Sequence, residues 1–331
     1  MIIESRAYAR AGLLGNPSDG YFGKTISIII RNFGAAVTLY KSPSLIIEEQ
    51  EEDLNQFRSI YQLSEKVSLT GYYGGTRLLK ATIKKFCDYC ENHKIKLAGK
   101  NFTLRYRSSI PRQVGLAGSS AIVTATIKAL MKFYEVDIPM PVLPSVILAV
   151  EKEELGINAG LQDRVIQVYE GCVYMDFNEK YLSKHLHGIY EPLNPNKLPK
   201  MYLAYKTQLG KESGKVLNDI RQRYDRGDEQ VRSVLTEIAG LAEKGKEALL
   251  EGDHECLFEL INRNFDLRAQ IMNIPESNKE MVRVARDCGA SAKFSGSGGA
   301  IVGTYADDEM LRKLIVRLKE INARVIKPYI L

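Results

Sequence analysis

Two glycine- and serine-rich stretches of the sequence could bind phosphate groups. The first is Pro111-Arg-Gln-Val-Gly-Leu-Ala-Gly-Ser-Ser-Ala121, which follows an expected strand and opens an expected helix. Gly115 and Gly118 let the backbone approach a ligand closely, and the first-turn N–H groups of a helix favour an anion. The alternative is a glycine turn with a serine N-cap. The sequence holds no G-x-x-x-x-G-K-[S/T], so the stretch is not a Walker-type loop.

The second stretch is Lys293-Phe-Ser-Gly-Ser-Gly-Gly-Ala-Ile-Val-Gly303. It lies between an expected helix and an apolar strand, where a glycine-rich segment can also be no more than a tight connection. Two such loops, far apart in the sequence and each at the boundary of an element, favour a nucleotide site over two unrelated turns.

Asp163 is the first candidate for acid–base chemistry. It lies in Gly160-Leu-Gln-Asp-Arg164, directly before the apolar Val165 and Ile166. A carboxylate near Mg²⁺-ATP stays ionised and could orient or deprotonate a substrate hydroxyl. An aspartate close to a glycine is alternatively only a cap or turn residue.

Glu151 is a candidate ligand for Mg²⁺. It follows the apolar run 142–150, and a magnesium ion that keeps its waters needs only one carboxylate and a hydroxyl from the protein. The alternative is a solvated glutamate, because Glu153 and Glu154 continue an acidic run. Phosphoryl transfer needs little covalent chemistry from the protein. Residues that bind the metal and the phosphate groups can therefore be sufficient for this reaction.

Several other functions are disfavoured by the composition. Cys87 and Cys90 form a C-x-x-C without a second pair at metal-site spacing, and the four histidines form no H-x-x-x-H or H-E-x-x-H pattern. Both observations disfavour zinc sites, so a helix over the two cysteines is the better interpretation. Five cysteines in a long chain disfavour a disulfide framework.

Charge and hydropathy bear on partners and location. The formal net charge is +6 with the basic residues scattered, which predicts no nucleic-acid surface. The N-terminus lacks a leader pattern and no apolar run is long enough for a bilayer, so we expect a cytoplasmic protein without a membrane partner.

The elements that must position these residues alternate without a regular βαβ rhythm, which predicts an α+β fold in two lobes. A length of 331 residues suggests about two domains, and the proline-rich Glu191–Lys200 marks the expected boundary. The patterns predict strands at 1–10, 25–30, 36–40, 44–49, 102–106, 171–177, 201–205, 300–304 and 323–329, and helices at 78–93, 119–133, 142–155, 215–250, 254–272, 279–288 and 308–321.

These motifs resemble those of the GHMP kinases, the superfamily of galactokinase, homoserine kinase, mevalonate kinase and phosphomevalonate kinase. Pro111–Ala121 resembles the signature P-x-x-x-G-L-G-S-S-A, Arg10–Asp19 the first motif R-V-N-L-I-G-E-H-x-D, and Lys293–Gly303 the third, glycine-rich motif. All three occur in the family's order. The chain reads G-L-A-G-S-S, one residue longer than the signature, which leaves the alignment of Ser119 and Ser120 open.

Within this superfamily the chain is most similar to the glucuronokinases. The similarity is carried by Arg6–Gly23, Gly71–Gly75, Ile110–Val123 and Leu155–Arg164. It implies a two-lobed GHMP kinase fold, with an ATP-binding N-terminal lobe (1–190) like ribosomal protein S5 domain 2 and a ferredoxin-like C-terminal lobe (191–331). It also implies an ATP-dependent kinase that phosphorylates D-glucuronate at its anomeric hydroxyl.

The resemblance implies a role for each motif residue. Asp163 would be the base, and Arg10 would lower its pKa and stabilise the transferring group. Mg²⁺ would be bound by Ser120 and Glu151. Asp19 would contact sugar hydroxyls, and a planar arginine would suit the uronate carboxylate, the candidates being Arg6, Arg77 and Arg112. ATP would be bound by Pro111, Gly115, Leu116, Ala117, Gly118, Ser119, Ser120, Ala121, Ser295, Gly296, Ser297 and Gly298.

Other functions stay open from the sequence. The chain could phosphorylate another sugar or a mevalonate-pathway substrate. It could also be an inactive relative that senses a ligand, although such a protein should lose the base or the metal ligand, and Asp163 and Glu151 are both present. An RNA-binding role lacks the interleaved basic and aromatic residues that it needs.

Overall fold

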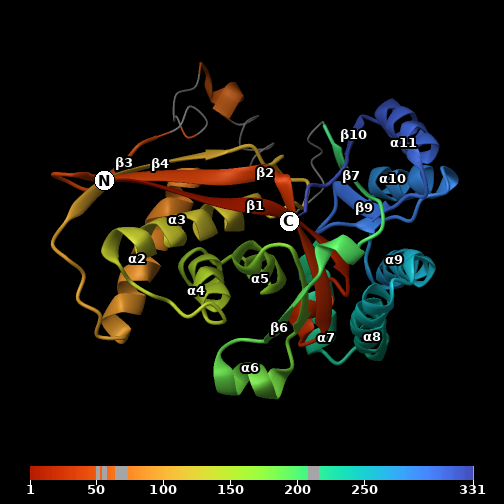
Figure 1. The fold of residues 1–331 in the computed structure, drawn as a ribbon, viewed down its shortest axis with the longest axis horizontal. Coiled ribbons are helices and arrows are strands. Elements are labelled where there is room, and N and C mark those ends of the chain that lie inside the picture. The colour runs from red at the N-terminus through yellow and green to blue at the C-terminus, as the bar shows by residue number, and fades with distance from the viewer. Residues whose placement is uncertain (50–52, 54–57, 64–73, 208–215, 331) are drawn as a thin grey trace. The chain divides into compact units, whose positions relative to one another are not determined.

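The computed structural model describes residues 1–49, 53, 58–63, 74–207 and 216–330, which form two compact units (Figure 1). Unit 1 contains Met1–Ala9, Asn32–Pro111 and Ala117–Val168; unit 2 contains Arg10–Arg31, Arg112–Leu116 and Tyr169–Leu331. The backbone passes from one unit to the other at several places, two of which lie within long strands. The expected lobes 1–190 and 191–331 stay a prediction.

Unit 1 is built on antiparallel strands. They come from β1 (Ile2–Leu14), β2 (Lys24–Ser42) and β4 (Asn101–Ser108), and the short β3 (Ile46–Ile47) runs parallel to β4. β2 pairs with β1 and, through Ala35–Ser42, with β4. The start of β1 alternates between exposed and buried residues, so one face of these strands is covered and the other meets solvent.

Helices cover the buried face of these strands. α2 (Gly75–Asn92), α3 (Gly118–Tyr134) and α4 (Leu143–Ala149) lie on one side of β1, β2 and β4 (Figure 1). α2 and α3 pack on each other, and the buried Phe86 of α2 lies against the ring of Tyr134 at the end of α3. Cys87 and Cys90 lie in α2, so the helical interpretation of the C-x-x-C is confirmed.

Unit 2 contains two sets of paired strands. The first part of β2, Lys24–Ile28, pairs antiparallel with β5 (Cys172–Asp176), which pairs antiparallel with β6 (Ile189–Leu193). A four-stranded antiparallel sheet has the order β10-β7-β9-β8. Its strands are β7 (Met201–Lys206), β8 (Lys293–Phe294), β9 (Ala300–Thr304) and β10 (Ala323–Ile326).

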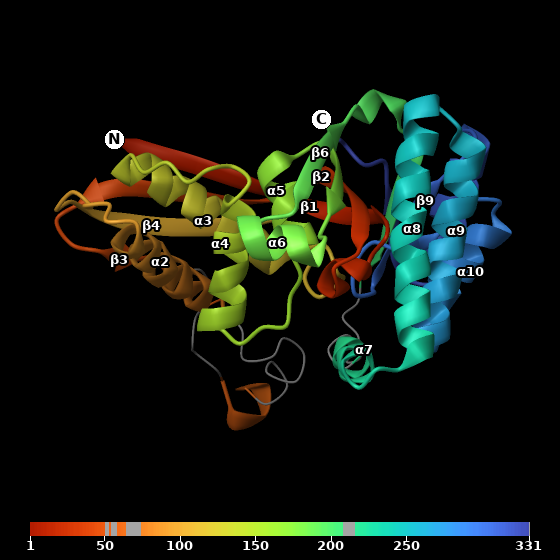
Figure 2. The same cartoon turned by 90° about the horizontal axis from the view of Figure 1, so that it is seen from below.

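The helices of unit 2 include a long hairpin. α8 (Glu229–Glu251) and α9 (His254–Ile271) lie side by side (Figure 2). Gly252 ends α8 in the left-handed conformation, and the Asp253 side chain caps α9 by accepting a hydrogen bond from the Cys256 N–H. The others are α6 (Glu179–His185), α7 (Val216–Asp225), α10 (Glu276–Asp287) and α11 (Asp308–Glu320).

Three elements differ from the sequence-based expectation. The strands expected at 25–30 and 36–40 are one continuous strand, β2. The helix expected at 142–155 is α4 followed by a π-helical turn, Val150–Glu154. The helix expected at 215–250 is broken between α7 and α8, where Gly227 has a positive φ and Asp228 caps α8.

The elements that were not expected include α5 (Gln162–Tyr169), α6, β6, β8 and the 3-10 helices Ser18–Tyr21 and Pro195–Lys197. Residues 71–73 of the Gly71–Gly75 motif lie outside the described residues.

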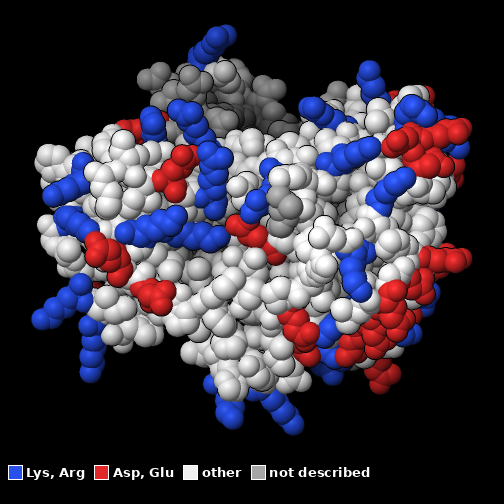
Figure 3. Space-filling view, viewed as in Figure 1, with Lys and Arg blue, Asp and Glu red and all other residues white. Residues whose placement is uncertain are grey.

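The surface agrees with the scattered charge of the sequence. Figure 3 shows positive and negative side chains interspersed on the face that it draws, without a continuous basic stripe on the described part of that face. None of the described helices has both the length and the apolar character that crossing a bilayer demands.

Candidate active site

The start of α3 in unit 1 has no side-chain cap. Its N-cap is Ala117, which adopts the left-handed conformation at φ 60° and makes no capping hydrogen bond through its side chain. Ser119 and Ser120 lie within the first turn, so the alternative of a serine N-cap is wrong. The Ser120 hydroxyl instead donates to the Ala117 carbonyl at 3.1 Å. The first-turn N–H groups thus keep the character of an anion site.

Glu151 is buried rather than solvated. Its side chain is 1% exposed, whereas the neighbouring Glu153 and Glu154 pair with lysines of α2 at the surface. The alternative of a surface glutamate is therefore wrong. Glu151 lies in the π-helical turn that follows α4, and such turns occur frequently at functional sites.

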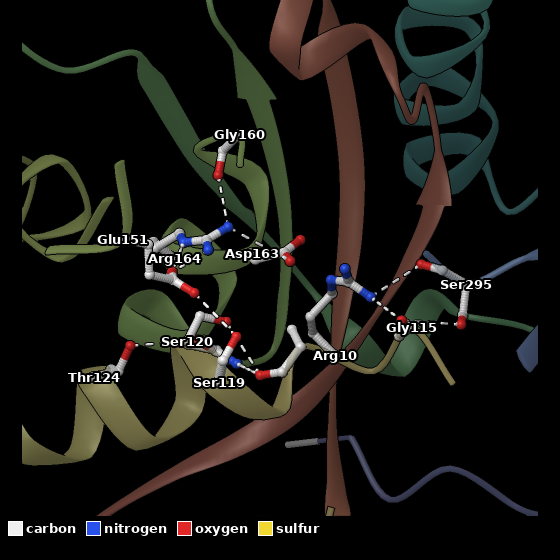
Figure 4. A network of polar contacts seen from close by, with 12 residues as sticks. Arg10, Gly115, Ser119, Ser120, Thr124, Glu151, Gly160, Asp163, Arg164 and Ser295 are labelled. Atoms are coloured by element: carbon white, nitrogen blue, oxygen red, sulfur yellow. Dashed lines mark hydrogen bonds and ion pairs between the residues drawn. The ribbon is translucent and has the colours of Figure 1, made fainter. Parts of the chain in front are cut away.

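A polar network fixes the Glu151 carboxylate (Figure 4). Its Oε1 accepts a hydrogen bond from the Ser119 hydroxyl at 3.0 Å. Its Oε2 accepts from Arg164 Nε at 2.9 Å and also from Nη2. Arg164 Nη1 donates to the Gly160 carbonyl at 2.8 Å. The buried charges of Glu151 and Arg164 are thus paired and hydrogen-bonded, which is the condition for tolerating them in the interior.

Asp163 shares the same arginine. It lies in the first turn of α5, and its Oδ2 is 3.6 Å from Arg164 Nη1. Figure 4 shows the Arg164 guanidinium between the carboxylates of Glu151 and Asp163. The Asp163 side chain is 20% exposed, so it is oriented by a fixed cation and still accessible to a ligand.

Gln167 was missed from the sequence. It lies one turn after Asp163 on α5, is fully buried, and donates from Nε2 to the carbonyls of Ala117 at 3.0 Å and Tyr8 at 3.1 Å. The left-handed Ala117 is thereby tied to β1. The extra residue of G-L-A-G-S-S therefore has a defined backbone position in unit 1.

In unit 2, Arg10 joins the two glycine loops. Its Nη1 donates to the Gly115 carbonyl at 2.6 Å and to the Ser295 carbonyl at 3.2 Å (Figure 4). Backbone hydrogen bonds add to this junction, from Arg10 N–H to the Leu116 carbonyl and from Gly12 N–H to the Ser295 carbonyl. The structure thus brings together loops that lie 180 residues apart in the sequence.

The glycines of this junction are required by its packing. A Cβ on Gly296 would overlap the Gly115 carbonyl oxygen and lie 2.8 Å from Arg10 Nη1. Gly115 has a φ of +72°, and a Cβ there would be 2.9 Å from the Gly298 carbonyl oxygen and 3.0 Å from the Ser297 nitrogen. Only glycine lets the backbones of both loops approach this closely.

Gly296→Ala is therefore expected to lower the free energy of unfolding by about 1–3 kcal/mol, because the added methyl group must displace a backbone carbonyl and a buried guanidinium. The matched control is Gly240→Ala in α8, where nothing lies within 4 Å of the added Cβ; it should gain about 0.5–1 kcal/mol. Urea denaturation of both variants measures the difference. Equal effects would show that the loops are loosely packed.

The first-motif loop of unit 2 is held by a buried lysine that the sequence did not single out. Lys293 Nζ donates to the carbonyls of Gly12 at 2.7 Å and Phe294 at 2.9 Å, and to Asn16 Oδ1. Burial, with the nearby guanidiniums of Arg268 and Arg10, holds the pKa of Lys293 well below its usual value. Asp19 follows in the 3-10 helix Ser18–Tyr21.

The three candidate arginines for a uronate are all exposed in their units. Arg6 pairs with Glu4 Oε1 at 2.8 Å and is 60% exposed, in a surface depression lined also by Arg105 and Arg107. Arg77 reaches the Leu155 carbonyl at 3.5 Å, and Arg112 lies at the surface of its loop. Their proposed contact with substrate stays a prediction.

Comparisons with known proteins show the family of this chain. The family model "GHMP kinases N terminal domain" matches residues 77–171, and "GHMP kinases C terminal" matches residues 246–323. Glucuronokinase 1 of Arabidopsis thaliana is 49% identical over 91% of this chain and 84% of its own length. Probable glucuronokinase 2 of the same plant is 50% identical over the same shares.

The fold has relatives among solved structures. The crystal structure of Lactococcus lactis galactokinase complexed with galactose has a TM-score of 0.79, with 14% identity, over 99% of this chain and 93% of that chain. The expected α+β fold in two domains, typical of GHMP kinases, is thus confirmed. Because relatives at about half identity cover nearly the whole chain and both family models match it, this chain belongs to the GHMP kinase family.

Proposed function

We propose that this chain is a glucuronokinase, which transfers the γ-phosphate of ATP to the anomeric hydroxyl of D-glucuronate and releases ADP and glucuronate 1-phosphate. The observation that carries the proposal is the high identity, over nearly the whole chain, to the two Arabidopsis glucuronokinases. The buried and paired residues of the candidate site support it, because each has a task in phosphoryl transfer.

The nucleotide would be bound by the glycine loops. The uncapped first turn of α3 offers N–H donors to phosphate oxygens. The loop around Ser295, Gly296, Ser297 and Gly298 supplies further backbone, and Arg10 holds it against Gly115. Arg10 acts here as a positioning residue, and we also assign to it the stabilisation of charge on the transferring phosphate.

The residues around Glu151 fit a magnesium ion. The Glu151 Oε1 and the Ser119 hydroxyl oxygen are hard donors and already lie 3.0 Å apart, which is the donor type that Mg²⁺ prefers. Arg164 occupies the other carboxylate oxygen. When bound, the metal would neutralise charge on the phosphates of ATP. We therefore assign Ser119, beside Glu151, to the metal in place of Ser120.

The two serines can be separated by experiment. Ser119→Ala is expected to raise the Mg²⁺ concentration for half-maximal activity about tenfold or more, because it removes one of two oxygen donors. Ser120→Ala removes a hydrogen bond to the Ala117 carbonyl and should change that concentration by less than about threefold. A magnesium titration of the activity of both variants, at saturating ATP, measures this concentration and shows which serine binds the metal. A larger effect for Ser120→Ala would reassign the metal ligand.

Asp163 would receive the proton of the substrate. As the anomeric oxygen bonds to the γ-phosphorus and the bond from that phosphorus to the β–γ bridging oxygen breaks, the hydroxyl proton passes to the Asp163 carboxylate. Arg164 keeps this carboxylate in place from one side. Asp19, in the first-motif loop, would accept hydrogen bonds from other sugar hydroxyls.

A substrate panel tests the proposal. The purified chain is incubated with Mg²⁺-ATP and, one at a time, glucuronate, galacturonate, glucose, galactose and mevalonate, and ADP release is coupled to an indicator reaction. We expect turnover with glucuronate to exceed turnover with the neutral hexoses and with mevalonate. Efficient turnover of another substrate, without turnover of glucuronate, would contradict the proposal.

A further inference from the structure

Arg268 in α9 is a buried guanidinium without a carboxylate. It is 1% exposed, and the described residues place no acidic group within ion-pair distance of it. Its Nη1 has no hydrogen-bond partner among them. Its Nε faces the Met272 sulfur at 2.8 Å, which is a weak acceptor, and the guanidinium lies 5.4 Å from the centroid of the Phe294 ring.

The other buried arginines are satisfied. Arg10 donates to two carbonyls, and Arg164 is paired with Glu151. Burying a guanidinium costs several kcal/mol unless an anion and hydrogen bonds compensate for its lost hydration. A native protein with such an unsatisfied group calls for a specific explanation, and a ligand that arrives later is one.

The position of Arg268 connects it to the loops of unit 2. One turn earlier on α9, Asn264 accepts from the Gly15 N–H at 2.8 Å and donates to the Asn16 carbonyl at 3.2 Å. The same helix face thus holds the backbone that leads to Asp19. Phe294, on which Arg268 packs, directly precedes Ser295 of the glycine loop.

Charged side chains of both signs lie close enough to Arg268 to act on its pKa. Arg10 and Lys293 are also buried; the charge of Arg10 lowers the pKa of Arg268, and both guanidiniums lower the pKa of Lys293. Burial and Arg10 lower the pKa of Arg268 to about 10, and Asp19 opposes this shift. A ligand with one negative charge would offset the cost of keeping the Arg268 guanidinium buried beside Arg10.

We propose that Arg268 binds the carboxylate of the sugar acid, with Nη1 as one of its donors. A planar guanidinium matches a carboxylate with two parallel hydrogen bonds. The nearby Asp19 disfavours a polyanionic phosphate at the same place, whereas it suits the hydroxyls of a monoanionic sugar. The apolar side chains of Met272 and Phe294 strengthen the interaction by excluding water. This inference rests on the proposed function and names its specificity residue.

The test compares glucuronate with glucuronamide, its neutral isostere, in the wild type and in Arg268→Met, by steady-state kinetics for sugar and ATP. Arg268→Met should lower kcat/KM for glucuronate on the order of 100-fold or more, because two charge-assisted hydrogen bonds are lost. It should leave kcat/KM for glucuronamide and KM for ATP within about threefold. The control is Arg263→Met, because Arg263 lies on the surface of the same helix and pairs with Glu237. This variant should leave kcat/KM for both sugars unchanged.

Folding is controlled by the melting temperature, which Arg268→Met should leave unchanged or raise, since it removes an unpaired buried charge. Arg268→Lys keeps the positive charge but cannot form two parallel hydrogen bonds with a carboxylate. It should reduce the preference for glucuronate over glucuronamide, measured as the ratio of their kcat/KM values, about tenfold. Equal losses for both sugars, or a loss confined to ATP, would overturn the inference. If the wild type does not phosphorylate glucuronate, the proposed function fails; if it does and both variants keep the discrimination, only this inference fails.

Discussion

Asp163→Asn is expected to lower kcat by about 100- to 10,000-fold, the usual contribution of a positioned general base. Asparagine has nearly the same shape, so it keeps the start of α5, but it cannot accept the proton of the sugar hydroxyl. The 3.6 Å contact of Asp163 Oδ2 with Arg164 is also weakened. Because the nucleotide loops are untouched, KM for ATP should change little. Steady-state kinetics with glucuronate and ATP measure both quantities.

The control for this substitution is Asp287→Asn. Asp287 is exposed at the end of α10, and its replacement should leave kcat unchanged within about twofold, since surface substitutions have small effects. Dissociation constants for ATP, measured by calorimetry, establish that Asp163→Asn still binds nucleotide. If Asp163→Asn keeps more than half of the wild-type kcat, the base is a different group.

Glu151→Gln should lower the free energy of unfolding by about 3–5 kcal/mol, the usual consequence of neutralising one member of a buried ion pair. Arg164 is 5% exposed and donates to the Glu151 carboxylate through Nε and Nη2. A neutral amide cannot neutralise this guanidinium. Chemical denaturation followed by circular dichroism measures the loss. The variant should also bind Mg²⁺ more weakly, because a charged ligand is gone.

Two further variants isolate the ion pair. Glu153 lies two residues from Glu151, pairs with Lys85 and is 65% exposed. Glu153→Gln breaks this surface ion pair and should lower the free energy of unfolding by at most about 1 kcal/mol. The double variant Glu151→Gln/Arg164→Met should lose clearly less than the sum of the single losses, because the unpaired charge disappears. Additive losses would show that the two side chains stabilise the chain independently.

The loop motifs could be identified from the sequence because they are local. Glycines at the boundary of a helix or strand allow close backbone approach, and the first turn of a helix favours an anion. Both properties depend on the local sequence and not on the rest of the chain. Asp163 was predicted on the same ground, because its motif lies in one short segment, and its role stays a prediction. The meeting of the two glycine loops, in contrast, depends on Arg10 and on the absence of a Cβ at Gly296, which no spacing along the chain reveals.

The burial of Glu151 could not be predicted. Its neighbours Glu153 and Glu154 are acidic as well, and the acidic run indicated a solvated face. The π-helical turn changes the direction in which residue 151 points, and the partner that neutralises it, Arg164, lies 13 residues later. The segment Gly160–Arg164 contained an indication of this burial. An arginine directly after a candidate base can pair with a buried acid.

Arg268 and Lys293 were missed for a similar reason. A charged residue at a helical position is usually a surface residue, and Arg268 lies among charged neighbours in α9. Only the packing of α9 on the first-motif loop and on Phe294 shows that its guanidinium is buried. The strands at 25–30 and 36–40 were separated because residues 31–35 interrupt the apolar pattern, yet pairing with β4 continues from Ala35.

The central claim is the transfer of phosphate from ATP to the anomeric hydroxyl of glucuronate, and a phosphorus NMR spectrum of the product tests it most directly. The purified chain is incubated with glucuronate, ATP and Mg²⁺, and proton coupling is recorded on the new phosphorus signal. We predict a sugar monophosphate whose phosphorus couples to the anomeric proton, formed in equal amount to ADP. A phosphate coupled to another sugar proton, or ADP formed with free inorganic phosphate as the only other product, would contradict the account.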